Sequence, residues 1–189
     1  MGFGEILLLR AFGRPRGILG RLGGRIMARM NAPCVASVLA LLHIELKHRL
    51  LEIGFGSGVG IALAARTAAA VAGVDPSREM VAQASARNRA AILAGRVDLR
   101  RANADDLSFR DDDFDIAFAI NSMQVWPDKV AGLNEIRRVL KPGGRLALGF
   151  TVNSGQPKEG VLETLVTGGL ANVRLIDGKG YFCAFGENL

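Results

Sequence analysis

The sequence predicts an α/β protein, with a doubly wound, mainly parallel sheet of seven strands that ends in an antiparallel hairpin. Two observations predict this. From residue 49 onward, short apolar runs typical of buried strands alternate with helix-like segments, and a glycine-rich turn follows the first run. Strands that alternate with helices form right-handed crossovers, which give a parallel sheet covered on both faces. The 189 residues, 49% hydrophobic and 22% charged, suit one globular domain that needs no disulfide or metal to fold.

The individual elements follow from the apolar runs and from the residues that begin or end them. Asp75-Pro76-Ser77 opens the second helix, and Pro142 with the paired glycines after it ends the third. The strands are expected at 49–53, 71–75, 97–102, 114–120 and 145–150, the helices at 57–69, 77–94, 128–140 and 160–167, and the closing hairpin at 172–185 around the turn Asp177-Gly178-Lys179-Gly180.

Positive charge is concentrated at the N-terminal end. The net charge is +6, and residues 1–30 hold six arginines against one acid, Glu5, so the rest of the chain is nearly neutral. A basic arm suits an anionic partner such as a membrane surface, a nucleic acid or an acidic substrate, and it equally suits a solvated or packed helix. The sequence contains no apolar stretch long enough to span a membrane and no signal-peptide pattern, so a cytoplasmic protein is expected.

Few residues are of the kinds that bind metals or act as bases. Cys34 and Cys183 are far apart and match no zinc or redox spacing, so both are expected to be small buried side chains. His43 and His48 precede the first strand and are interpreted as surface or packing residues. The sequence therefore predicts no metal site and assigns no catalytic residue.

A glycine-rich turn joins the first strand to the first helix. Gly54, Gly56, Gly58 and Gly60 fall at every second position there. Glycine permits a tight turn and lets a ligand approach the main chain, and the helix that follows offers unpaired N–H groups. In an open parallel sheet, ligands bind at this carboxyl end of the strands, so the turn predicts a cofactor site.

Two cofactors could use such a turn, a dinucleotide or S-adenosylmethionine. The dinucleotide pattern Gly-x-Gly-x-x-Gly fails, because Val59 or Ile61 occupies its last position. Glu52 would place a negative charge near phosphates, whereas it suits a ligand with an ammonium and a sulfonium centre. Asp75 ends the second strand, where a carboxylate can accept hydrogen bonds from both ribose hydroxyls; the alternative is that Asp75 caps the helix starting at Pro76.

Four segments, including the glycine-rich turn and Asp75, follow one another in the order found in a known family. Leu51–Gly58 looks like a cofactor loop, and Asp75, with Met80 after it, looks like a ribose-binding strand end. Asn103–Phe109 is similar to an adenine-binding segment, and Glu135–Gly144 matches the pattern E-x-x-R-V-L-K-P-G-G. In this order the segments resemble the class I S-adenosylmethionine-dependent methyltransferases, in the branch of the ubiquinone/menaquinone-biosynthesis methyltransferase and its type 11 relatives.

The resemblance covers about residues 50–150 and implies a Rossmann-like fold, methyl transfer from S-adenosylmethionine, and S-adenosylhomocysteine as the product. It implies that the glycines wrap the methionine end of the cofactor, that Asp75 holds the ribose, and that Asn103 and Ala104 read the adenine. Asn121 and Ser122 would face the transferred methyl group. The residues expected to bind the cofactor are Glu52, Gly54, Phe55, Gly56, Gly58, Asp75, Pro76, Met80, Asn103, Ala104, Asp105, Asn121 and Ser122.

Two departures from the family pattern affect the chemistry. Asn103 stands where Asp is commoner, and an amide can still hydrogen-bond to adenine. Gln124 stands where many relatives have His, which removes the easiest general base. Displacement at a sulfonium depends mainly on proximity and alignment, so a base is needed only where the acceptor holds a proton. Met123, Gln124 and Trp126 are expected to line the pocket of a small-molecule acceptor; the alternative for Met123 and Trp126 is a place in the core.

The basic arm suggests how an acceptor is held. Arg21, Arg25 and Arg29 form one stripe on a helix, next to an apolar stripe. Such a helix can cover the acceptor pocket as a lid, or it can lie on an anionic membrane, peripheral to it, where the acceptor would be a phospholipid or quinone. Both hypotheses stay open. We therefore divide the chain into a basic helical arm or lid, residues 1–48, and a cofactor-binding core, residues 49–189.

A third hypothesis is a non-catalytic cofactor-binding partner subunit, which the short core and the absent histidine keep open. A nucleic acid is the least favoured partner, because the arm lacks aromatic residues interleaved with its arginines.

Overall fold

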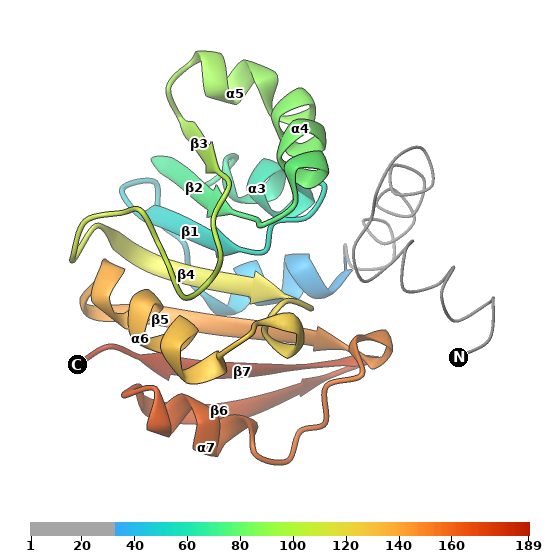
Figure 1. The fold of residues 1–189 in the computed structure, drawn as a ribbon, viewed down its shortest axis with the longest axis vertical. Helices are drawn as coiled ribbons and strands as arrows, with labels where there is room; N and C mark the ends of the chain where they lie inside the picture. The colour runs from blue at the N-terminus through green and yellow to red at the C-terminus, as the bar shows by residue number, and fades with distance from the viewer. Residues whose placement is uncertain (1–32) are drawn as a thin grey trace.

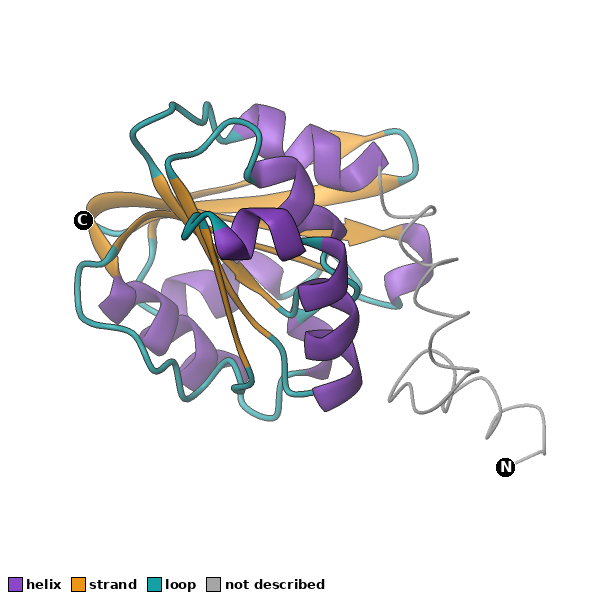
Figure 2. Ribbon diagram, turned by 90° about the horizontal axis from the view of Figure 1, so that it is seen from above, coloured by secondary structure: helices purple, strands orange, loops and turns teal. Residues whose placement is uncertain are grey.

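The computed structural model describes residues 33–189, in which one seven-stranded sheet carries helices on both faces (Figure 1, Figure 2). This confirms the predicted fold class. The arginine-rich part of the arm, residues 1–32, lies outside the described residues, and so do the lid and membrane hypotheses that depend on it.

Strands and helices alternate along the chain as the apolar runs predict. The strands are β1 (Arg49–Ile53), β2 (Ala70–Val74), β3 (Val97–Arg100), β4 (Phe114–Ile120), β5 (Leu140–Thr151), β6 (Ala171–Gly178) and β7 (Tyr181–Glu187). The helices are α3 (Val59–Ala64), α4 (Arg78–Arg87), α5 (Arg89–Leu93), α6 (Lys129–Val139) and α7 (Val161–Thr167), with short 3-10 helices η2 (Met123–Val125) and η3 (Val152–Ser154). Residues 33–41, ahead of β1, are also helical.

The order of the strands creates a switch point in the middle of the sheet. The order is β3-β2-β1-β4-β5-β7-β6. Strands β1 to β5 run parallel to one another, and β7 is antiparallel to both β5 and β6. The chain runs outward from β1 to β3 and then returns to the other side of β1 as β4. The two crossovers leave in opposite directions at β1 and β4, and sheets of this kind bind ligands beyond the carboxyl ends of the strands at such a point.

Each face of the sheet buries its own apolar cluster. On one face, side chains of the helix at residues 33–41 and of α3 and α4 pack on strand residues such as Leu50 and Phe118. On the other face, α6 and α7 pack on residues such as Leu51 and Leu148. Neighbouring strand residues thus point to opposite faces, as a sheet covered on both sides requires. Among the helices of residues 33–189, none combines the length and apolarity that spanning a membrane requires.

Two predicted helices are shorter or broken in the structure. The helix expected at 57–69 is α3, which starts only after Gly58, because Gly58 adopts a left-handed φ of 77°. The helix expected at 77–94 divides into α4 and α5 at Asn88, whose side chain donates hydrogen bonds to the carbonyls of Gly58 and Ala84 at 3.1 and 2.9 Å. A backbone conformation at Gly58 and a tertiary contact of Asn88 thus override the local preference for helix.

The turn of the C-terminal hairpin is shorter than predicted. Gly178 pairs with Tyr181, so Lys179 and Gly180 form the turn and Asp177-Gly178 belongs to β6. A Cβ atom on Gly178 would lie 2.0 Å from the Tyr181 ring. The ring therefore packs across this glycine, and the Asp-Gly pair serves packing in the strand rather than the turn.

Candidate functional site

The glycine loop, Gly54–Gly58, leaves β1 at the switch point of the sheet. Gly54, Gly56 and Gly58 have φ angles of 73°, 53° and 77°, in the left-handed region that favours glycine. The loop ends where Gly58 becomes the N-cap of α3. These angles turn the chain sharply, as the spacing of the glycines predicts, and of the three glycines only Gly56 has no atom within 4 Å of a Cβ position.

Gly54 also allows the ends of β1 and β4 to lie close together. A Cβ atom at this position would lie 2.1 Å from Oγ of Ser122, the second residue after β4. The Ser122 hydroxyl in turn accepts a hydrogen bond from Nε1 of Trp126 at 2.9 Å. The ends of β1 and β4 are therefore in direct contact, and only glycine fits between them.

Two residues at the end of α4 hold the glycine loop from outside. Arg87 donates from Nε to the Ser57 carbonyl at 2.8 Å, and Asn88 donates from Nδ2 to the Gly58 carbonyl. Sequence reasoning missed both, because thirty residues separate each donor from its acceptor. An Asn inside a helix pattern was the one available signal, since Asn side chains compete for main-chain partners and interrupt helices.

Asp75, immediately after β2, ties the loop to the neighbouring strand. Its Oδ2 accepts a hydrogen bond from Gly56 N and its Oδ1 accepts one from Ser77 N, both at 2.9 Å. The residue is 7% exposed, and this burial raises the pKa of its carboxyl against the opposing effect of the two hydrogen bonds. The N-cap of α4 is Ser77, whose Oγ accepts from Met80 N, so Asp75 is not the cap of that helix.

Glu52 places a second buried carboxylate behind the loop. It is 3% exposed and accepts a hydrogen bond from the main-chain N–H of Ile61. A Cβ atom on Gly60 would lie 2.2 Å from its Oε1, so the absence of a side chain at Gly60 makes room for the carboxylate. Its Oε2 is buried and has no hydrogen-bond partner. Burial first, and the nearby charge of Asp75 as well, raise the pKa of Glu52 well above its ordinary value.

The other residues expected to bind the cofactor differ in exposure. Phe55 and Met80 are buried in the apolar cluster shared with α3 and α4. Pro76 is exposed beside Asp75, and its carbonyl accepts a hydrogen bond from Arg101. After β3, Asn103 is exposed, Asp105 is half-buried and Ala104 is buried near Trp126 and α6. All of them lie near the carboxyl ends of parallel strands, the same edge as the glycine loop.

The segment after β4 joins this edge to β5. Asn121, at a φ of 49°, donates from Nδ2 to Oγ1 of Thr151 and accepts from Thr151 N, both at 2.8 Å. Met123 and Trp126 are 1% and 8% exposed and belong to the apolar cluster under α6. This is the alternative in which both residues have a place in the core. The Gln124 side chain is half-buried, and its Oε1 has no hydrogen-bond partner.

Two apolar residues at this edge were not singled out from the sequence. Val125 in η2 is 67% exposed, and Val152 in η3 is 76% exposed. They follow β4 and β5, the two strands that Asn121 and Thr151 link. No local sequence pattern predicts their exposure, because it depends on how the separate segments after β4 and β5 fold.

The histidines and cysteines contribute packing in the described part of the chain. His48 is buried and its Nδ1 accepts a hydrogen bond from Glu45 N at 3.0 Å, whereas His43 is exposed. Cys34 and Cys183 are buried, as predicted, and burial raises the pKa of their thiols to about 11 and about 12. Residues 33–189 contain no group of three or more His, Cys, Asp or Glu side chains that could hold a metal ion.

Comparison with known proteins decides the family. Residues 51–148 match the family described as a methyltransferase domain, and they make up half of the chain. The chain belongs to this methyltransferase family. The matched residues include β1, the glycine loop, Asp75 and the segment after β4, so the family assignment rests on the same part of the chain as the site.

Individual relatives of this methyltransferase domain agree with the assignment. It is 40% identical over 115 residues to a methyltransferase, GfsG, of Streptomyces halstedii, which covers 60% of this chain and 41% of the relative. It is 41% identical over 106 residues to the ubiquinone/menaquinone biosynthesis C-methyltransferase UbiE of Geotalea daltonii, covering 53% of this chain and 44% of that protein. The chain thus spans less than half the length of these two relatives.

The fold of the methyltransferase domain also matches solved structures. A SAM-dependent methyltransferase from Aquifex aeolicus superposes with a TM-score of 0.74 at 19% identity, over 82% of this chain and 89% of that one. This likeness concerns the fold. Together with the family match, it confirms the predicted class of S-adenosylmethionine-dependent methyltransferases.

Proposed function

We propose that this methyltransferase domain transfers the methyl group of S-adenosylmethionine to a small-molecule acceptor bound at the carboxyl edge of the sheet. One observation carries the proposal: two buried carboxylates, Asp75 and Glu52, lie at a glycine loop that is open at Gly56. Asp75 holds the loop through Gly56 N, and Glu52 keeps one buried oxygen without a partner. A structure without a cationic ligand in this place would leave that oxygen uncompensated.

The residues of the site suit the parts of this cofactor. Nothing lies within 4 Å of a Cβ atom built on Gly56, so a ligand can contact the loop there. The Asp75 oxygens retain lone pairs for ribose hydroxyls beside the two N–H groups they already accept. The unpartnered oxygen of Glu52 suits the positive charge of an ammonium or sulfonium centre. Asn103 and the main chain of Ala104 would hydrogen-bond to the adenine.

The chemistry asked of the protein is mainly alignment. Bound here, the cofactor supplies a methyl group already activated on a sulfonium. The glycine loop and the carboxylates fix its orientation, and the tight contact between Gly54 and Ser122 fixes the floor of the crevice. Alignment of two reactants can give an effective molarity of roughly 10⁵ M or more. Gln124, with an unpartnered amide oxygen, can accept a hydrogen bond from an acceptor N–H or O–H group.

The surface beside the crevice favours an acceptor with an apolar part. Val125 and Val152 present exposed apolar side chains after β4 and β5, on the strand ends that the Asn121–Thr151 hydrogen bonds join. Small-molecule sites are lined mainly by apolar groups with a few polar ones that fix orientation. Gln124, next to Val125 in η2, is a polar residue at this edge.

Replacing Glu52 with glutamine separates stability from cofactor binding. In the native chain the folded-state pKa is raised from an ordinary 4.5, so the folded protein keeps a proton that the unfolded chain has lost. The free energy of unfolding therefore falls as the pH rises from 4.5 through the raised pKa. Glu52→Gln removes this penalty and should leave the ligand-free protein at least as stable at neutral pH, while weakening S-adenosylmethionine binding.

Denaturant unfolding and calorimetric binding at about pH 5 and about pH 8 measure both effects. In the native chain, cofactor affinity should rise with pH as the two carboxyls ionise. In Glu52→Gln, the rise should be smaller and come from Asp75 alone, whose pKa is also raised. An unchanged affinity and an unchanged pH profile in the variant would remove Glu52 from the site.

The activity itself is tested by S-adenosylhomocysteine formation with a panel of small phenols, quinols and amines. We expect turnover with at least one apolar acceptor and none without an acceptor. Tight calorimetric binding of S-adenosylmethionine without turnover on any acceptor would contradict the proposed activity and favour the hypothesis of a non-catalytic cofactor-binding subunit.

A further inference from the structure

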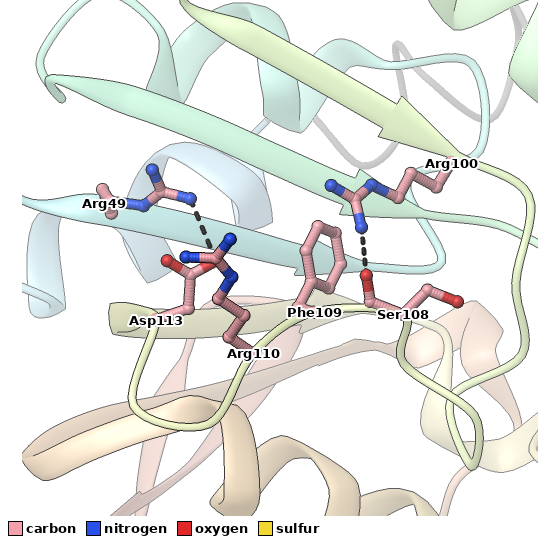
Figure 3. A pocket seen from close by; sticks show the side chains of 6 residues that line it. All are labelled: Arg49, Arg100, Ser108, Phe109, Arg110 and Asp113. Carbon is pink, nitrogen blue, oxygen red and sulfur yellow. Dashed lines mark hydrogen bonds and ion pairs between the residues drawn. The ribbon is translucent and has the colours of Figure 1, made fainter.

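A second hollow lies away from the glycine loop. Residues 101–113, which connect β3 to β4, cross the sheet as a loop without a helix. Beneath this loop a basin of about 550 Å³ opens (Figure 3). We call it the arginine basin; the residues that line it are Arg49, Arg100, Ser108, Phe109, Arg110 and Asp113. Ser108 and Phe109 end the segment that resembles an adenine-binding segment; the other four residues were not expected from the sequence to bind a ligand.

Two aromatic rings hold two of the guanidinium groups in place. Phe109 and Phe114 pack edge to face with their centroids 5.0 Å apart. The Arg100 guanidinium lies 4.1 Å from the centroid of the Phe109 ring, and that of Arg49 lies 5.4 Å from the Phe114 centroid. Figure 3 shows Arg49 and Arg100 on either side of Phe109. Side chains fixed in this way lose little freedom when they bind a ligand.

The basin has an excess of positive charge. Arg49 pairs with Asp113 at 3.0 Å, and Arg100 pairs outside the lining with Asp98 at 2.7 Å and donates to the Ser108 carbonyl. Arg110 is exposed and makes no hydrogen bond or ion pair with any described residue. Two of the three guanidiniums are thus paired with a carboxylate, and the third, that of Arg110, is available to a ligand.

We propose that the arginine basin binds a phosphate-bearing small molecule, a diphosphate or phosphate ester, at a site separate from methyl transfer. The planar guanidinium fork matches the oxygens of a phosphate group. The unpaired guanidinium of Arg110 suits an anionic group, and a volume of about 550 Å³ is that of a small-molecule site rather than of a single ion. Arg49 begins β1, whereas the glycine loop follows the end of the same strand, and none of the residues that line the basin belongs to the glycine loop.

Calorimetric titration of the full chain with inorganic pyrophosphate at low ionic strength tests the proposal. Saturable binding is expected, weakened by about fivefold in Arg110→Gln, since a single exposed ion pair contributes up to about 1 kcal/mol. The matched control is Arg89→Gln, an equal loss of charge at an exposed arginine in α5, which packs on the opposite face of the sheet. Equal affinities in the two variants, or no saturable binding, would overturn the proposal.

Two further titrations identify the class of ligand and the site at which it binds. Pyrophosphate should bind equally well when S-adenosylhomocysteine saturates the protein; competition between them would place the phosphate in the cofactor site and contradict a separate basin. A short single-stranded oligonucleotide is expected to bind no better than pyrophosphate. If the oligonucleotide binds and pyrophosphate does not, the basin contacts a nucleic-acid backbone and the small-molecule assignment is wrong.

Discussion

Replacing Asp75 with alanine is expected to weaken S-adenosylhomocysteine binding by about 100-fold, because each hydrogen bond to a charged group contributes about 1.5–3 kcal/mol. The variant loses the carboxylate offered to the ribose and also the acceptor that holds Gly56 N in place. Stability falls as well, by about 1–3 kcal/mol, since the main-chain N–H groups of Gly56 and Ser77 lose their buried partner. Calorimetric titration and denaturant unfolding measure the two losses.

Ser77→Ala is the matched control for this experiment. It removes the N-cap of α4, whose Oγ accepts from Met80 N at 3.3 Å, and should cost about 1 kcal/mol of stability. It leaves both oxygens of Asp75 in place, so cofactor affinity should stay within about twofold of the native chain. If Ser77→Ala weakens binding as much as Asp75→Ala does, general loosening of the strand end, and not a ribose contact, explains the effect.

The parts of the fold that depend on local signals could be predicted from the sequence. β1 and β4 have the predicted bounds, because each is a continuous apolar run with a clear end. The glycine loop was predicted from its spacing, and the positive φ angles of Gly54 and Gly58 are the physical reason for those glycines. The roles given to the individual cofactor-binding residues remain predictions.

The parts that depend on particular side-chain contacts could not be predicted. Asn88 interrupts a helix where its side chain reaches Gly58, thirty residues back along the chain. The first two residues of the expected hairpin turn, Asp177 and Gly178, belong to β6, where the Tyr181 ring packs on Gly178. The unpartnered oxygen of Glu52 depends on how α3 closes over β1, which no periodicity describes. In each case the outcome depends on which side chains meet, and a sequence pattern does not show that.

The central claim is that a cofactor lies directly against the main chain of the glycine loop, and Gly56 allows the most direct test. Gly56→Ala places a methyl group in space that the protein leaves open, with no atom within 4 Å. Gly95→Ala, before β3 and remote from the loop, is its match: Gly95 has a φ of 70° against 53° for Gly56, and its Cβ position is equally open. Both variants carry a left-handed alanine, which costs about 1–2 kcal/mol.

Calorimetric titration of both variants with S-adenosylmethionine separates the ligand contact from the strain. We predict similar losses of stability but a loss of cofactor affinity of at least about tenfold in Gly56→Ala alone, because a methyl group forced into a close contact costs about 1–3 kcal/mol. Equal affinity in Gly56→Ala, Gly95→Ala and the native chain would show that no cofactor lies against this loop and would contradict the account.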